Sequence, residues 1–277
     1  MRLTTTLSAG SVTTTLTAGA ASDVGSVRLV NEDSFLATGS IYLVADGMGG
    51  HRAGDRASQA VRESFVSHIP ETDAATTSEI LGAISAANDL VREISEDGAL
   101  SGTTLAGVAV VESAGTLQWM AFNIGDSRVY QFDGRTLTQL SVDHSAVQEL
   151  LDDGSITLAE AAVHPDRNVI TRAIGATDVV DADVWLLPMI GTQTFLLCSD
   201  GLSKELDDRR IADILVRHDP ATAAVELVAA AVAAGGADNV TAVVVQSNSV
   251  SSGSDLEHTG ERLTISTREL DDTRPRI

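Results

Sequence analysis

The chain has 277 residues, enough for one large domain or two small ones with a substantial core. Its 39 acidic and 18 basic residues give a formal net charge of −21, which argues against binding nucleic acid or an anionic membrane through bulk charge. The single cysteine, Cys198, excludes an intramolecular disulfide and a zinc–cysteine cluster. No apolar run approaches the ~20 residues that span a bilayer, and the threonine-rich start lacks the apolar stretch of a signal peptide. These features predict a cytoplasmic protein without a nucleic-acid or membrane partner.

The first part of the chain predicts β-strands. Residues 1–22 alternate small, polar and apolar side chains without a helical period and predict one or two strands. The apolar run 41–45 predicts a buried strand, and the sequence Asp46-Gly47-Met48-Gly49-Gly50 after it predicts a loop of unusual backbone freedom.

Two amphipathic helices are expected next. Apolar side chains recur at helical spacing from Ala57 to Ile69 and again from Ile80 to Ile94. Thr76 and Glu79 have the spacing of a capping box at the start of the second helix. Both helices are expected to cover a sheet.

The middle of the chain returns to strand patterns, in residues 103–111, 116–124 and 127–132. Asp133-Gly134 predicts a hairpin into residues 135–140, so this section is expected to form an antiparallel meander. Residues 143–172 carry two short helical patterns and are expected to form a lid between strands.

The last part of the chain predicts strands at 184–187, 194–198 and 240–246, with two helices between the second and the third. One of these helices covers residues 209–217, and the other has Asp219 as its N-cap and Gly235-Gly236 as its stop. Strands that alternate with helix pairs favour antiparallel sheets with helices packed outside. Residues 248–277 are poor in apolar side chains, so we expect a folded domain over 1–247 and a mobile polar tail after it.

Four aspartates, Asp46, Asp126, Asp200 and Asp238, each follow a strand-like run or a Gly-rich turn. Carboxylates placed there can meet at one edge of a sheet, where they repel one another unless a divalent cation holds them together. Oxygen-only ligands favour Mg²⁺ or Mn²⁺ over zinc. The pattern therefore favours a hard-metal site in an enzyme that acts on phosphate, although Asp46-Gly47 by itself is also an ordinary turn dipeptide.

Six motifs carry a family resemblance because they occur together and in one order. They are Arg28-Leu29-Val30-Asn31-Glu32-Asp33-Ser34, Asp46-Gly47-Met48-Gly49-Gly50-His51, Ser101-Gly102-Thr103-Thr104, Ile124-Gly125-Asp126-Ser127-Arg128, Cys198-Ser199-Asp200-Gly201-Leu202 and Asp238-Asn239-Val240-Thr241. Over roughly residues 15–247 the series resembles that of metal-dependent Ser/Thr protein phosphatases, the type 2C or PPM family, in its bacterial form.

The resemblance implies an α+β fold, a four-layer α-β-β-α sandwich in which two mainly antiparallel sheets are flanked by helix pairs. It implies hydrolysis of phosphoserine and phosphothreonine in proteins by a hydroxide that bridges two Mn²⁺ or Mg²⁺ ions. The partners would be phosphoprotein substrates and, by family analogy, a cognate Ser/Thr kinase.

The resemblance also implies a role for each matching position. The metal ligands would be Glu32, Asp46, the carbonyl of Gly47, Asp200 and Asp238 for two core ions, with Asp126 and Asn168 at a third, weaker ion. Asp46 would bridge the core ions. Arg28 would grip the substrate phosphate with its planar fork, so the catalytic set is Arg28, Asp46, Asp200 and Asp238.

The proton donor is the point at which the sequence departs from the eukaryotic pattern. The position two residues after Asp46, often histidine there, is Met48, which cannot be a general acid. His51 lies nearby and is either a substitute donor or a structural residue. A water on the metal is the other candidate.

The interpretation of four other residues also starts from the motifs. Asp33 is either a neighbour of the metal or a turn cap. Arg128 is expected to brace its loop, and Asn239 to orient Asp238 or cap the loop. Cys198 is followed six positions later by Lys204 instead of the arginine of cysteine-dependent phosphatases, so it is expected to be a core residue.

Two alternatives to a general protein phosphatase stay open. One is a phosphoprotein-binding or sensing module that has kept the fold without catalysis, although all the core ligands are present. The other is a phosphatase dedicated to one regulatory phosphoprotein.

Overall fold

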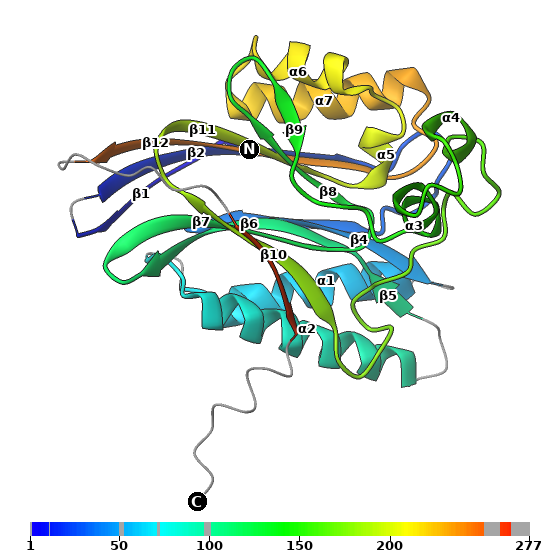
Figure 1. Ribbon diagram of the computed structural model, residues 1–277, viewed down its shortest axis with the longest axis horizontal. Helices are drawn as coiled ribbons and strands as arrows, with labels where there is room; N and C mark the ends of the chain where they lie inside the picture. Colours follow the sequence, from blue (N-terminus) through cyan, green and yellow to red (C-terminus); the bar gives the residue numbers. More distant parts are fainter. Residues whose placement is uncertain are drawn as a thin grey trace, which may run out of the picture.

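The computed structural model describes residues 2–10, 12–49, 53–70, 73–96, 101–251 and 261–266. The elements stack in four layers, helices, sheet, sheet and helices (Figure 1). Helices α1 (Ala53–His68) and α2 (Thr77–Glu96) cover one sheet, and α6 (Asp208–Leu215) and α7 (Pro220–Ala234) cover the other. The expected α-β-β-α sandwich is confirmed.

The sheet under α6 and α7 has six strands, each antiparallel to its neighbours. Their order is β1 (Arg2–Ala9), β2 (Val12–Asp23), β12 (Val240–Ser251), β11 (Gly191–Cys198), β8 (Arg128–Phe132) and β9 (Leu137–Gln139).

The sheet that faces α1 and α2 is also antiparallel throughout. Its order is β13 (Glu261–Ser266), β10 (Asp181–Pro188), β7 (Thr116–Ile124), β6 (Leu105–Ser113), β4 (Ile41–Gly49) and β3 (Asp33–Thr38), with β5 (Ser101–Thr103) paired to the end of β4.

Three apolar cores fill the spaces between the four layers, one core between each two adjacent layers. Strand β7 shows how the sequence builds two of them: Trp119 and Ala121 face the opposite sheet, whereas Met120 and Phe122 face the helices. Trp119 packs on Phe195 of the other sheet, with ring centroids 4.9 Å apart. These cores hold both sheets rigidly enough to position loops at their ends.

Two local expectations are wrong in detail. Strand β4 does not end at Ala45 but runs to Gly49, because Gly47 to Gly49 pair with β5. The meander is divided, since β6 and β7 belong to one sheet and β8 and β9 to the other. The chain changes sheets between Ile124 and Arg128, through Gly125 at φ +97°, and this crossing carries Asp126.

The end of the chain also differs from the expected boundary at residue 247. Strand β12 continues to Ser251, and Glu261–Ser266 form β13 beside β10, so these residues do not belong to a mobile tail. Backbone hydrogen bonds to an existing sheet edge do not depend on apolar side chains, so a polar composition does not exclude an edge strand. The rest of the expected tail, 252–260 and 267–277, lies outside the described residues.

The predicted lid leaves the sheet after β9 and carries the short helices α3 (Ala146–Asp152) and α4 (Leu158–Ala161). The Thr157–Glu160 capping box that starts α4 is present, as is the Thr76–Glu79 box of α2. Backbone bonds close the base of the lid, from Ala146 N to Val169 O at 2.9 Å and from Thr171 N to His144 O at 2.9 Å. None of the helices in the described part of the chain has the length and apolar character needed to cross a membrane.

Candidate metal centre

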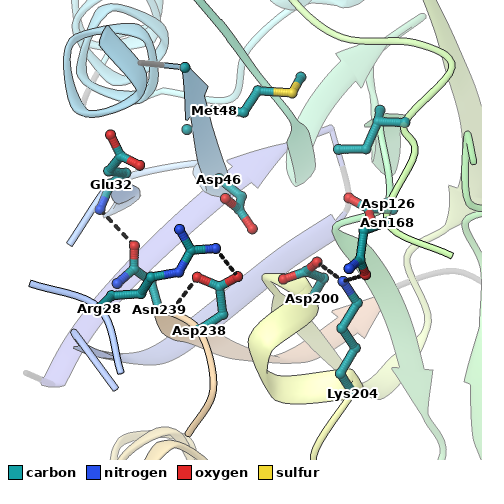
Figure 2. A pocket seen from close by; sticks show the side chains of 13 residues that line it. Arg28, Glu32, Asp46, Met48, Asp126, Asn168, Asp200, Lys204, Asp238 and Asn239 are labelled. Atoms are coloured by element: carbon teal, nitrogen blue, oxygen red, sulfur yellow. Dashed lines mark hydrogen bonds and ion pairs between the residues drawn. The ribbon is translucent and has the colours of Figure 1, made fainter. Parts of the chain in front are cut away.

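A cavity of about 320 Å³ lies at one end of the sandwich, where β4, the crossing between the sheets, the lid and the loop before β12 meet. It is lined by Arg28, Glu32, Asp46, Gly47, Met48, Gly49, Asp126, Asn168, Ile170, Asp200, Lys204, Asp238 and Asn239 (Figure 2). Every residue that the sequence predicts as a metal ligand or as a phosphate-binding group therefore lines this one cavity.

Asp46 projects into the cavity from β4, and its backbone is held by two threonines. Its N–H donates to Thr104 Oγ1 at 3.0 Å, and its carbonyl accepts from Thr103 Oγ1 and Thr104 N, each at 2.9 Å. Burial, with the charges of Asp33, Asp200, Asp126 and Asp238, raises the pKa of Asp46 well above its ordinary value. Without a cation, this carboxylate is electrostatically unfavourable.

Asp126 is only 7% exposed, and its Oδ1 has no hydrogen-bond partner among the described residues. Burial and the charge of Asp200 raise the pKa of Asp126 to about 7. The crossing that carries Asp126 is held by His144, whose Nδ1 accepts from Gly125 N at 3.0 Å. The buried, unpartnered oxygen suits a cation ligand.

Asp200 starts helix α5 (Asp200–Ser203), directly after β11. One carboxylate oxygen, Oδ2, pairs with Lys204 Nζ one turn later, and Oδ1 has no partner within the described chain. Lys204 Nζ also donates to Asn168 Oδ1 of the lid at 2.8 Å (Figure 2). Burial alone would lower the pKa of Lys204, but the charge and hydrogen bond of Asp200 raise it.

Asp238 lies across the cavity and pairs with Arg28, Nη2 to Oδ2, at 2.7 Å. The loop that carries Arg28 is held by Asn239, whose Nδ2 donates to Val24 O at 2.9 Å and Val30 O at 3.0 Å. Asn239 Oδ1 also accepts from Glu32 N at 2.8 Å (Figure 2). Asn239 therefore fixes the loop, as expected, and with it the positions of Arg28 and Glu32.

Gly47 and Glu32 meet at the start of α1 because glycines leave room there. Gly47 N donates to Glu32 O at 3.2 Å, and Ser58 Oγ donates to the same oxygen at 2.6 Å. A Cβ on Gly47 would overlap the Gly54 carbonyl and lie 2.7 Å from Glu32 O. Gly47 is thus required for close backbone approach and not, as expected, for a flexible loop.

Asp33 stands behind the cavity wall. Its Oδ2 accepts from Ser199 Oγ at 2.8 Å, and burial raises the pKa of Asp33 to about 7. The turn cap here is Asn31, whose Oδ1 accepts from Asp33 N at 3.1 Å. Of the two interpretations, the structure favours a neighbour of the site.

The remaining sequence interpretations separate clearly. Arg128 is held by Asp143 through Nε and Nη2 at 2.9 and 2.7 Å, which braces the base of the lid. Cys198 is fully buried, and burial raises the pKa of its thiol to about 12, so it cannot act as a nucleophile. Met48 lines the cavity, and His51 lies outside the described residues.

Three contributions were missed from the sequence: Lys204, His144 and the threonines 103 and 104. Lys204 had a signal, because an acid and a lysine four residues apart face each other on a helix. His144 had none, since its contact with the Gly125 backbone depends on a return of the chain over 19 residues.

The donors suit hard cations, because carboxylate, amide and carbonyl oxygens line the cavity. Two of the carboxylate oxygens, Asp126 Oδ1 and Asp200 Oδ1, are buried and have no hydrogen-bond partner in the described part of the chain. Among the described residues no three His, Cys, Asp or Glu side chains are gathered as ligands of a single ion. The five carboxylates of Glu32, Asp46, Asp126, Asp200 and Asp238 instead line one cavity from several elements. Fold and site together define the class of metal-dependent phosphoric ester hydrolases.

Comparison with known proteins identifies the family. The protein phosphatase 2C family model matches residues 26–240. The Listeria welshimeri serine/threonine phosphatase stp is 36% identical over 251 residues, which cover 84% of this chain and 96% of that protein. The crystal structure of the Mycobacterium tuberculosis phosphatase PstP/Ppp matches with a TM-score of 0.74 and 36% identity, over 88% of this chain and 99% of that one.

A second similar structure is that of the catalytic domain of PstP in complex with two manganese ions. It has a TM-score of 0.74 and 34% identity, and the match covers 85% of this chain and 99% of that chain. This chain belongs to the protein phosphatase 2C family, and the expectation of a protein phosphatase is confirmed.

Proposed function

We propose that this chain hydrolyses phosphoserine and phosphothreonine in proteins with two Mn²⁺ or Mg²⁺ ions held by Glu32, Asp46, the Gly47 carbonyl, Asp200 and Asp238. The observation that carries the proposal is the crowding of Asp46, Asp126, Asp200 and Asp238 around one cavity, where the pKa of Asp46 is raised by burial and by the other three carboxylates. Such ions, when bound, activate water and polarise phosphoryl oxygens. The complex of the similar PstP domain with two manganese ions supports the proposed number and kind of ions.

Arg28 supplies the phosphate-binding group. Its side chain is 51% exposed at the cavity mouth, and its partner Asp238 is one of the proposed ligands. An Asp238 carboxylate engaged by a cation would leave the Arg28 guanidinium free to contact two phosphate oxygens. The bonds of Asn239 to Val24 and Val30 hold the loop that carries Arg28.

The leaving serine or threonine oxygen needs a proton. None of the described residues that line the cavity is a histidine, and the thioether of Met48 cannot donate one. Water that reaches the cavity is the proposed source of the proton, and His51, which lies outside the described residues, is the alternative that the sequence offers.

The lid supports a protein substrate. A second cavity of about 630 Å³ runs beneath α3 and α4 and shares Asp126, Asp200 and Lys204 with the first. A phosphorylated side chain in the first cavity leaves the second for flanking residues of its chain. A cognate Ser/Thr kinase as counterpart, a role in signalling and a cytoplasmic location complete the proposal.

The decisive experiment is hydrolysis of a phosphothreonine peptide with and without Mn²⁺, by wild type, Asp126→Ala and the exposed-surface control Asp89→Asn. We expect Mn²⁺-dependent hydrolysis that the control retains and that Asp126→Ala reduces, because it removes a carboxylate from the accessory position. Metal-independent hydrolysis would contradict the two-ion assignment. Peptide binding without turnover would instead favour a sensing module, and turnover of only one regulatory phosphoprotein would favour a dedicated enzyme.

A further inference from the structure

The ammonium group of Lys204 is a cation of the protein itself that lies in the acidic cavity, at the side of the lid. It contacts two groups that the sequence assigns to metal binding, the Asp200 carboxylate and the Asn168 amide oxygen, the latter at 2.8 Å. Figure 2 shows the ammonium between these oxygens, and Asp126 lines the same cavity. The contacts place a positive charge where the sequence predicts a third, weaker metal ion.

The charge of Lys204 acts on the surrounding carboxylates. Lys204, Asp46 and Asp126 line the same cavity, so the positive charge of the ammonium offsets the negative charge of these carboxylates. Asp200 holds it on one side through a carboxylate whose side chain is only 14% exposed. A divalent ion bound to Asp126, Asn168 and Asp200 would have to displace this ammonium, because like charges repel at such distances.

The same contact joins two parts of the fold. Asn168 belongs to the lid, whereas Asp200 and Lys204 belong to the first turns after β11. A hydrogen bond between Lys204 and Asn168 therefore fastens the lid to the metal-binding wall without an ion between them.

We propose that Lys204 is an internal cation that substitutes for the third metal ion, holding the lid residue Asn168 against Asp200 and lowering the affinity of that position for Mn²⁺. The inference rests on the proposed function for the two core ions only. It makes Lys204 a positioning residue, which acts through Asn168, Asp126 and Asp200.

Counting Mn²⁺ ions tests the proposal directly. Titration of the full chain with MnCl₂, followed by calorimetry and by the EPR signal of free Mn²⁺, gives the affinity of each class of ion. In Lys204→Met, which keeps the length of the side chain without its charge, ions beyond the core pair should bind at least about tenfold more tightly than in wild type. Lys204→Arg keeps the charge and should resemble wild type, and adding Asp126→Asn to Lys204→Met should abolish the gain.

Hydrogen exchange of the metal-free protein provides a second readout that does not depend on bound ions. Peptides that cover residues 158–172 should exchange faster in Lys204→Met than in wild type or Lys204→Arg, because the tie to Asn168 is lost. Equal affinity for additional Mn²⁺ in wild type and Lys204→Met would overturn the proposal. A raised KM for phosphopeptide with unchanged Mn²⁺ binding would also overturn it and assign the ammonium to the substrate. Failure of the core pair to bind in wild type would count against the proposed function, and lid exchange would still decide the role of Lys204.

Discussion

The two ends of the cavity neutralise their acids in different ways. At one end, Asp238 pairs with Arg28, half exposed on a loop that backbone hydrogen bonds from Asn239 hold. At the other end, Asp200 pairs with Lys204, which lies one helical turn away and is also tied to the lid. Arg28 is placed to leave Asp238 and contact a bound phosphate, as proposed above. Lys204 has two partners, Asp200 and Asn168, and is placed to keep them.

The backbone supports of the two ends differ in the opposite sense. Asp46 lies within a paired strand, and Glu32 and Gly47 meet at a contact between backbones that admits no side chain at residue 47. Asp126 and Asn168 come from a crossing between sheets and from an exposed lid. The rigid end therefore suits the proposed core ligands Glu32, Asp46 and Gly47. The end beside the lid adds Asp200 to that set and suits adjustment to the substrate.

The largest expected effect separates the two ends by their carboxylates. Asp46→Asn should lower kcat by about 10³-fold or more, because the proposed ligand of both core ions would contribute several kcal/mol to transition-state stabilisation. Asp126→Asn should cost about tenfold or less, since it affects only the accessory position. Steady-state hydrolysis of a phosphothreonine peptide at saturating Mn²⁺ measures both, with Asp89→Asn as control. Equal losses would remove the distinction between the ends.

The next effect concerns Arg28. Arg28→Ala should lower kcat/KM by about ten- to a hundredfold, the equivalent of one or two charge-assisted hydrogen bonds to phosphate. Arg28→Lys should recover only part of the loss, because an ammonium cannot make the bidentate contact. Kinetics on the peptide and inhibition by inorganic phosphate measure it. Unchanged phosphate inhibition in Arg28→Ala would place the phosphate elsewhere.

A smaller effect tests the backbone contact at the rigid end. Gly47→Ala should destabilise the protein by about 1–3 kcal/mol, because its Cβ would overlap the Gly54 carbonyl. Gly82→Ala is a matched control within α2, where nothing lies within 4 Å, and should stabilise by up to about 1 kcal/mol. Urea unfolding with chelator present compares them. A neutral Gly47→Ala would show that α1 and β4 can separate without cost.

The smallest effect is a pH dependence of stability in the metal-free protein. The pKa values of Asp33 and Asp126 are about 7 in the fold, against an ordinary 3.8. Between those values the folded state holds protons that the unfolded chain releases, so stability should fall as pH rises from about 4 to about 7. Thermal unfolding in chelator from pH 5 to pH 8 measures the slope.

A matched variant assigns that slope to the cavity. Asp126→Asn should flatten it, because it removes one of the two titrating carboxyl groups. Mn²⁺ should flatten it in wild type, because a cation opposes the burial and the charge repulsion that raise the pKa values. A melting temperature that rises with pH in chelator would contradict the assignment of repelling carboxylates.

Much of the fold and of the site could be predicted from the sequence, for local physical reasons. The helical period from Ala57 to Ile69 and from Ile80 to Ile94 predicted α1 and α2, because one apolar face must be buried wherever the helix packs. The N-caps Asp219 and Thr157 could also be predicted, because an N-cap bonds to the first turn of its own helix, and both caps are present. Aspartates at the ends of apolar runs converge because strand ends share an edge.

Only the tertiary structure decided the features that depend on distant segments. Strand periodicity could not show that β7 and β8 belong to different sheets, since both patterns are compatible with a hairpin. Polar composition could not exclude β13, because an edge strand is held by backbone bonds to β10. The reason for a glycine at position 47 is its close approach to Gly54, which only the packing of α1 on β4 shows. The bond of Lys204 to Asn168 forms because the lid brings together two residues that are 36 positions apart in the chain. The sequence by itself determined which oxygens this phosphatase can offer to cations, and the packing of the two sheets and the lid decided where a lysine already supplies the charge.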